Sequence, residues 1–234
     1  MSQSITTIGL DADDTLWHNE NIFETHHKIF CDILSDYHDT KTVEKQLFDI
    51  EMKNLNLYGY GIKSFTLSSI ETAIKLTEGK IDVDEIKRII ERCKEMLDHP
   101  VELLGHVPSI VQQLSESYRL ILITKGDLRD QERKIARSGL AQCFEATEIV
   151  SEKTSSSYAR ILQRHSIDPK QFLMVGNSLK SDILPVLDLG GYGVHIPYAT
   201  TWIHERVDSP PAPNSFFHQL DSIEELPPLL EKIG

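Results

Sequence analysis

Two hydrophobic patterns divide the chain into two kinds of segment. Short apolar runs occur at residues 5–10, 120–123, 146–150, 172–175, 193–196 and 216–220. Short aliphatic runs are typical of strands that a sheet buries on both faces. Amphipathic stretches around them predict helices near 107–117, 128–138, 155–165, 181–188 and 223–232. Strands and helices that alternate across short loops predict an α/β fold with a doubly wound parallel sheet.

The segment from residue 17 to 99 has apolar residues at every third or fourth position instead. Such spacing places them on one face of a helix. Helices are predicted near 22–34, 43–57, 64–78 and 83–97, the last with a stripe of Ile86, Ile89, Ile90, Cys93 and Met96. We therefore predict an α/β core, residues 1–16 and 100–234, interrupted by a helical cap, residues 17–99. An insertion after the first strand would hang over the carboxyl ends of the strands as a lid.

A proline-rich stretch precedes the last predicted strand. Residues 200–214 contain the run Pro210-Pro211-Ala212-Pro213 among polar residues. Proline and polar clusters of this kind predict an ordered but irregular connection at the surface.

Charge and cysteine content restrict the class of partner and the compartment. The 234 residues carry a formal net charge of −12, which argues against DNA or RNA as a partner, because nucleic-acid binding requires clustered basic residues. The three cysteines, Cys31, Cys93 and Cys143, lie far apart and suggest neither disulfides nor a zinc site. We find no long apolar run and no export signal, so we expect a protein of the cytoplasm that does not enter the membrane.

The loop after the first predicted strand holds two carboxylates, Asp11 and Asp13, two positions apart. Ligands collect at the carboxyl ends of strands in open parallel sheets. One carboxylate can act as a nucleophile while its neighbour handles a proton. An acidic surface turn is the alternative that this motif alone leaves open.

Two later strands also end in residues suited to an anion. Thr124, Lys125 and Gly126 follow the run 120–123, and a hydroxyl beside the backbone amides of such a turn can hold phosphate oxygens. Thr124 could equally cap the next helix. Lys153 follows the run 146–150, where it could pair with both a carboxylate and a phosphate, although a solvated surface lysine is the default interpretation.

The order of these motifs resembles that of the haloacid dehalogenase-like hydrolase superfamily. Its first motif is matched by the hydrophobic strand followed by Asp11-Ala12-Asp13-Asp14-Thr15-Leu16, its second by Thr124 and its third by Lys153. The run Gly176-Asn177-Ser178, with Asp182 after it, is similar to the fourth motif, but Asn177 stands where the family usually has an aspartate. The resemblance covers nearly the whole α/β part, and the helical insertion lies where many of these phosphatases have their cap.

The resemblance implies a site for Mg²⁺ and a function in phosphoryl transfer. Asp11 would be the nucleophile, Asp13 the acid and base, and Thr124, Lys125 and Lys153 would contact the phosphate. The metal would be held by Asp11, the backbone of Asp13, Asn177 and Asp182. An amide at position 177 can still ligate a hard cation, though without the attraction of a carboxylate. Asp182 as an ordinary helix N-terminal acid is the alternative interpretation.

We therefore expect a Mg²⁺-dependent phosphomonoester hydrolase that acts on a small phosphorylated metabolite such as a sugar phosphate, phosphoglycolate or a nucleotide. Dehalogenases of the superfamily usually lack the second acid of the first motif, so Asp13 favours phosphate. A phosphomutase, a haloacid dehalogenase and a catalytically weakened phosphate-binding module remain as alternatives. Lys63, in the stretch 58–65, could reach the substrate from the predicted cap or be solvated in a loop between helices. We expect a monomer or a homodimer.

Overall fold

The computed structural model describes residues 4–200, 202–205, 207, 211–212 and 214–233. The chain divides into two compact units. The first, which we call the α/β unit, comprises Met1–Glu20, Val101–Lys125 and Glu132–Gly234. The second, the helical unit, comprises Asn21–Pro100 and Gly126–Gln131. The division into a core and a cap at residues 17–99, and the role of that cap as a lid, stay predictions.

The α/β unit is built on a six-stranded parallel sheet with the order β3-β2-β1-β4-β5-β6. The strands are β1 (Thr7–Leu10), β2 (Arg119–Lys125), β3 (Ala146–Val150), β4 (Phe172–Gly176), β5 (Tyr192–His195) and β6 (Phe217–Gln219). The helices of this unit are α5 (Val107–Ser115), α7 (Ser155–Arg164), α8 (Leu184–Leu187), α9 (Leu226–Ile233) and the part of α6 (Leu128–Ser138) from Glu132 onward. The predicted doubly wound parallel fold is confirmed. Because β2 and β4 flank β1, the loops after these three strands meet at one edge of the sheet.

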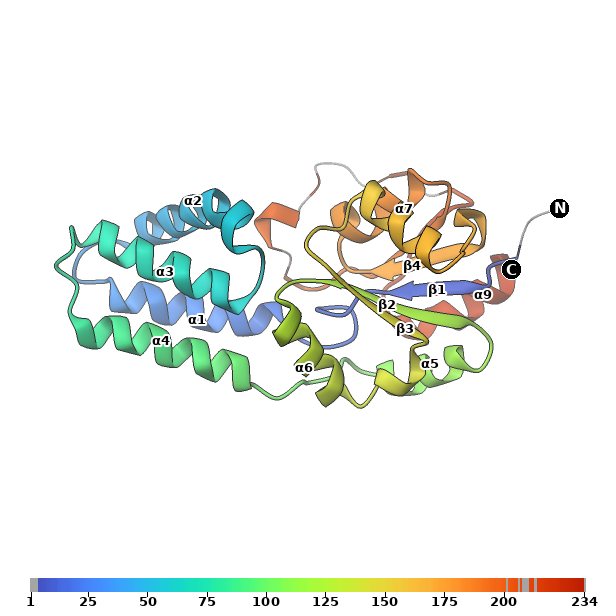
Figure 1. Ribbon diagram of the computed structural model, residues 1–234, viewed down its shortest axis with the longest axis horizontal. Coiled ribbons are helices and arrows are strands. Elements are labelled where there is room, and N and C mark those ends of the chain that lie inside the picture. Colours follow the sequence, from blue (N-terminus) through green and yellow to red (C-terminus); the bar gives the residue numbers. More distant parts are fainter. Residues whose placement is uncertain (1–3, 201, 206, 208–210, 213, 234) are drawn as a thin grey trace. The chain divides into compact units, whose positions relative to one another are not determined.

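Both faces of the sheet are covered by helices, as the short apolar strands predict. Alternate strand residues point to opposite faces. Leu120 and Leu122 belong to the core that includes α5 and α9, whereas Ile121 and Ile123 belong to the core that includes α7. Figure 1 shows α5 and α7 on opposite sides of the strands. The sheet therefore sits in a dry interior and holds the strand ends in fixed positions.

The turn after β4 departs from the predicted helix. Residues Leu179–Ile183 form a single π-helical turn, and the short helix α8 follows it. A π turn adds one residue to the ordinary helical repeat. The 3.6-residue periodicity predicted an ordinary helix near 181–188. It did not predict the wider π turn that precedes α8.

The helical unit contains α1 (Glu20–Ile33), α2 (Thr40–Tyr58), α3 (Ile62–Leu76) and α4 (Val83–Asp98). Asp39 caps α2 by accepting a hydrogen bond from the Thr42 amide at 3.1 Å, and Asp82 caps α4 in the same way through Asp84. The polar first turn explains why α2 begins before the apolar stripe that starts at Val43. None of the described helices is long and apolar enough to cross a bilayer.

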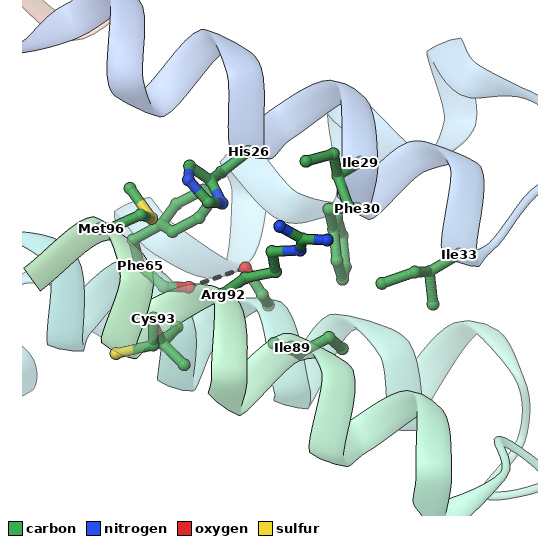
Figure 2. A pocket seen from close by; sticks show the side chains of 11 residues that line it. His26, Ile29, Phe30, Ile33, Phe65, Ile89, Arg92, Cys93 and Met96 are labelled. Carbon is green, nitrogen blue, oxygen red and sulfur yellow. Dashed lines mark hydrogen bonds between the residues drawn. The ribbon is translucent and has the colours of Figure 1, made fainter. Parts of the chain in front are cut away.

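The core of the helical unit is apolar and includes Phe30, Leu34, Val43, Leu47 and Phe65. A small pocket of about 20 Å³ lies beside it, with room for about one water molecule. Figure 2 shows His26 and Arg92 on its wall among apolar side chains. Several hydroxyl groups inside α3 are satisfied locally: that of Thr66, for example, donates to the carbonyl four residues earlier.

The proline-rich connection falls only in part on residues that can be described. Ile203–Glu205 form a 3-10 turn within it. Positions 210 and 213, two of the three prolines in the predicted surface run, lie outside the described residues.

Candidate active site

Three charged side chains from three strand ends meet in the α/β unit. Asp11 follows β1, Lys153 follows β3, and Asp182 lies in the turn after β4. The Lys153 ammonium bonds to Asp11 Oδ1 and lies 2.7 Å from Asp182 Oδ1. All three side chains are buried, with 2% of Lys153, 8% of Asp11 and 1% of Asp182 exposed. The structure therefore brings together three predicted site residues that are far apart in sequence.

Burial and charge act against each other in this cluster. Burial raises the pKa of Asp11 to about 7; the Lys153 ammonium lowers it and the Asp182 carboxylate adds to the rise. Burial alone would lower the pKa of Lys153, but the Asp11 and Asp182 carboxylates raise it above its ordinary value. Lys153 therefore stays protonated at neutral pH. One ammonium faces two carboxylates, so further positive charge would stabilise the ionised cluster.

Thr15 links the first motif to the fourth. Its hydroxyl donates to Asp11 Oδ2 at 2.9 Å and accepts from the backbone amide of Asn177 at 3.1 Å. The hydroxyl thus orients the candidate nucleophile and fixes the start of the turn after β4. The sequence motif includes Thr15, yet sequence reasoning assigned it no role.

The Asp13 carboxylate has partners of its own. Lys134 Nζ, on α6, lies 2.6 and 2.8 Å from its two oxygens, and the Trp17 indole donates to Oδ1 at 2.7 Å. Lys134 also donates to Asn19 Oδ1 at 3.2 Å. The two acids of the first motif are therefore held by different cations. Sequence reasoning missed Lys134, because nothing near it on α6 marks it among other surface lysines.

Asp14 has a structural task beside these two acids. Its φ of 61° is left-handed, a conformation that aspartate tolerates better than most residues. The carboxylate accepts from the amides of Asn19 at 2.8 Å and Glu20 at 3.0 Å, at the start of α1. Burial raises the pKa of Asp14 to about 7, and the bond from the Glu20 amide opposes the rise. Asp14 thus shapes the loop that presents Asp11 and Asp13.

The turn after β4 is braced by its own side chains. The amide of Ser178 donates to Asp182 Oδ2 at 3.0 Å, and the Ser178 hydroxyl accepts from the Ser181 amide at 3.0 Å. His195 Nε2 donates to the carbonyl of Asn177 at 3.0 Å. A β-carbon at Gly176 would strike the Asp182 carboxylate, so glycine is required there. These contacts fix Asn177 and Asp182 at the edge where Asp11 lies.

The remaining predicted contacts lie in different surroundings. Thr124 is buried at the end of β2, in register with Ile149 of β3. Lys125, the last residue of β2, pairs with Glu205 and donates to the Ser181 hydroxyl at 3.0 Å. Lys63 lies in the first turn of α3 within the helical unit, where it pairs with Asp127 at 2.9 Å.

The donor set of the site suits a hard cation. Asp11 and Asp182 supply carboxylates, Asn177 supplies an amide oxygen 3.3 Å from the Thr15 hydroxyl, and the excess negative charge noted above favours a cation. Among the described residues, no group of three His, Cys, Asp or Glu side chains is arranged as a metal site. The donors available here are instead two side-chain carboxylates, an amide oxygen and a backbone carbonyl. These donors are therefore of the kind that Mg²⁺ prefers.

Comparisons with known proteins identify relatives of this chain. A family model described as haloacid dehalogenase-like hydrolase matches residues 5–190. The mouse N-acylneuraminate-9-phosphatase is 28% identical over 222 residues, 89% of this chain and 81% of the relative. A crystal structure of a haloacid dehalogenase-like hydrolase from Xanthomonas campestris is 40% identical, covers 99% of this chain and 92% of that one, and has a TM-score of 0.88.

A more distant structure extends the comparison of fold. The hydrolase YfnB from Bacillus subtilis, solved with bound magnesium, is 15% identical with a TM-score of 0.63, over 97% of this chain and 99% of that one. At this identity the likeness concerns the fold alone. The family model covers the motifs from Asp11 to Asp182. The resemblance seen in those motifs is thus confirmed, and the chain belongs to the haloacid dehalogenase-like hydrolase family.

Proposed function

We propose that this hydrolase cleaves phosphate monoesters of a small metabolite through an aspartyl-phosphate intermediate. The observation that carries the proposal is the buried pairing of Lys153 with both Asp11 and Asp182, together with a second acid, Asp13, on a separate cation. A nucleophile, a positive charge beside it and an independent proton-handling group are what phosphoryl transfer requires. The phosphatase name of the curated relatives supports the same chemistry.

In the first step a carboxylate oxygen of Asp11 attacks phosphorus as the bond from phosphorus to the leaving oxygen breaks. Lys153 favours the ionised form of Asp11 and offsets the charge that develops on the phosphoryl oxygens. Thr15 holds the carboxylate in one orientation through Oδ2. Thr124, with the backbone amides after Asp11, would bind the other phosphoryl oxygens.

Asp13 handles the protons of both steps. It gives a proton to the leaving oxygen and later accepts one from the water that attacks the aspartyl phosphate. Its ion pair with Lys134 and the hydrogen bond from Trp17 favour the carboxylate that the second step needs. Turning away from Lys134 would allow it to carry the proton of the first step.

Magnesium, when bound by Asp11, Asp182, Asn177 and the carbonyl of Asp13, supplies positive charge that lets an anionic ester approach two carboxylates. We propose this ion as the cofactor. Asn177 makes the set less negative than one with aspartate, which is the observation behind a second candidate, a phosphate-binding module with weakened metal binding. Calorimetry with Mg²⁺ separates the two, since a working site binds the ion and loses it in Asp182→Ala.

The test of the main proposal is release of phosphate from p-nitrophenyl phosphate with Mg²⁺. Wild-type protein should turn over, lose activity in EDTA, and lose about 10⁴-fold or more in kcat as Asp11→Asn. Asp221→Asn, at an exposed position of the same unit, is the matched control and should behave as wild type. Failure of the wild type across a broad panel of phosphate esters would overturn the proposal.

We propose a phosphorylated sugar or sugar acid as the first substrate class to test. N-acylneuraminate 9-phosphate belongs in the panel because relatives at 26–28% identity are named for it. Phosphoglycolate and nucleotides complete the panel. We also propose a cytoplasmic location. We further propose a monomer or a homodimer, and size-exclusion chromatography with light scattering tests this oligomeric state.

A further inference from the structure

Glu205 is a buried acid outside the four motifs. It ends the 3-10 turn Ile203–Glu205 in the connection before β6, and 11% of its side chain is exposed. Its carboxylate pairs with Lys125 and accepts from the hydroxyls of Ser178 and Ser181, both at 2.6 Å. A buried carboxylate with this many partners belongs to a built network rather than to a surface connection.

The partners of Glu205 come from two different loops. Lys125 ends β2, while Ser178 and Ser181 belong to the turn after β4. These strands flank β1, and Asp11 follows β1. Glu205 therefore ties together the two loops on either side of the candidate nucleophile.

A second contact anchors the same turn of chain. Lys180 Nζ donates to the carbonyl of His204 at 2.7 Å. Lys125 also donates to the Ser181 hydroxyl, which itself donates to Glu205, so the network is closed. Closed networks of charged and hydroxyl groups hold their members more firmly than single bonds do.

The network keeps Glu205 ionised. Burial would raise its pKa, but Lys125 and the hydroxyls of Ser178 and Ser181 lower it to about 2. The carboxylate is therefore charged at neutral pH and can hold both loops. Removing it would leave a buried ammonium and two hydroxyls without their common acceptor.

We propose that Glu205 is a positioning residue for the reaction at Asp11. By joining Lys125 to the turn after β4, it sets the spacing between Thr124 on one side of Asp11 and Asp182 on the other. This inference rests on the proposed phosphatase function. Because catalytic groups must be placed within a fraction of an ångström, loosening this link should slow the chemical step more than it weakens substrate binding.

The test compares Glu205→Ala and Glu205→Gln on p-nitrophenyl phosphate with Mg²⁺. Glu205→Ala should lower kcat by about 10- to 100-fold with KM within about twofold. Glu205→Gln keeps the length and an oxygen acceptor, and its amide can donate to a serine hydroxyl, so it should recover most of kcat. Glu231→Gln, at an exposed position, is the control and should match wild type.

Several kinetic outcomes would overturn the inference. One is that kcat of Glu205→Ala stays within twofold of wild type. Another is that KM rises while kcat is unchanged, which would make Glu205 a substrate contact. The alanine variant must lose kcat per folded molecule. A fall in activity that is fully explained by a smaller folded fraction, measured in a melting curve, therefore also counts against the inference.

A readout independent of turnover separates this inference from the proposed function. Hydrogen–deuterium exchange of the peptide covering 176–183 should speed up in Glu205→Ala, and by less in Glu205→Gln. If wild type hydrolyses no phosphate ester, the proposed function fails. Unchanged exchange in Glu205→Ala would instead reject the link between the loops, whatever the activity of the wild type.

Discussion

The α/β unit and the helices α1–α4 bury polar groups in opposite ways. At the strand ends Lys153, Asp11 and Asp182 are buried as charged partners from distant parts of the chain. The buried polar residues of α1–α4, all of which the structure describes, are uncharged, and hydroxyls such as those of Ser69 and Thr72 bond to a carbonyl of their own helix. A buried charge needs a partner fixed by the tertiary structure, whereas a hydroxyl in a helix needs only its own backbone. The buried charged side chains are thus found at the strand ends, where the sheet fixes their positions.

The largest expected effect comes from removing the central cation of the α/β unit. Lys153→Met leaves two buried carboxylates without their common partner. We expect kcat to fall by about 10³-fold or more, because the charge that stabilises the phosphoryl oxygens is lost. Unfolding in urea should show a loss of about 3–5 kcal/mol. Lys170→Met, at an exposed position, is the control, and a fall in kcat of less than tenfold in Lys153→Met would refute the central role of the cluster.

A cavity in the helical core should affect stability alone. Leu47 is fully buried there, and Leu47→Ala should lower the free energy of unfolding by about 2–5 kcal/mol. We expect kcat per folded molecule to be roughly unchanged, since no charged partner is removed. Leu57→Ala, where the native side chain is 79% exposed, is the matched control. A loss of catalysis without a loss of stability in Leu47→Ala would break the contrast between the two regions.

Removing Lys134 tests the second ion pair of the α/β unit. In Lys134→Met the Asp13 carboxylate keeps the Trp17 indole but loses its ion pair with Lys134. We expect kcat to fall by about 10- to 100-fold, because a general acid and base that is no longer held in place transfers protons less efficiently. Steady-state kinetics should show a partial recovery in Lys134→Arg. Equal rates in the wild type and Lys134→Met would show that Asp13 does not need this partner.

Acid titration should reveal the link at Glu205. Its pKa is lowered from 4.5 to about 2 in the folded protein, so the stabilisation is fully present above pH 4.5 and is lost as the pH falls toward 2. Linkage gives an upper contribution of about 3 kcal/mol, and partial exposure reduces it to about 2 kcal/mol. Urea unfolding of the wild type and Glu205→Gln should therefore differ most above pH 4.5. A constant difference between pH 2 and 7 would contradict the ionised form.

The smallest effect is expected at an exposed ion pair of the helical unit. Lys63 and Asp127 have side chains that are 52% and 28% exposed, so their pair should contribute less than about 1 kcal/mol. Lys63→Met should therefore leave the melting temperature nearly unchanged. If Lys63 contacts the substrate, as its sequence context allows, KM will rise instead, and an unchanged KM would remove it from the predicted substrate contacts.

Much of the fold could be predicted because the strands of the sheet correspond to short apolar runs in the sequence. The aliphatic runs at 120–123 and 172–175 lie within observed strands, since short continuous apolar stretches have few alternatives to a buried strand. The π turn of Leu179–Ile183 could not be predicted, because its pattern of apolar residues differs little from that of an ordinary helix.

Some residues of the candidate site could likewise be predicted from the sequence, and others could not. Asp11, Lys153 and Asp182 could be proposed because each follows a predictable strand, and parallel strands bring their ends together. Lys134 and Glu205 could not, because their partners Asp13 and Lys125 lie 121 and 80 positions away and no local pattern marks the pairs. Contacts of this kind follow from the tertiary structure and become visible only with it.

The π-helical turn after β4 also limits which deletions and substitutions the protein can tolerate there. Asp182 lies within this turn, with its amide bonded to the Ser178 carbonyl at 2.8 Å and its carboxylate 2.7 Å from Lys153 Nζ. Deleting one residue between Ser178 and Asp182 would rotate Asp182 by about 100° around the helix axis and move it away from Lys153. The side chains of Leu179 and Lys180 can be exchanged without such a rotation. Natural variation and protein engineering must therefore preserve the number of residues in this turn as well as Ser181 and Asp182 themselves.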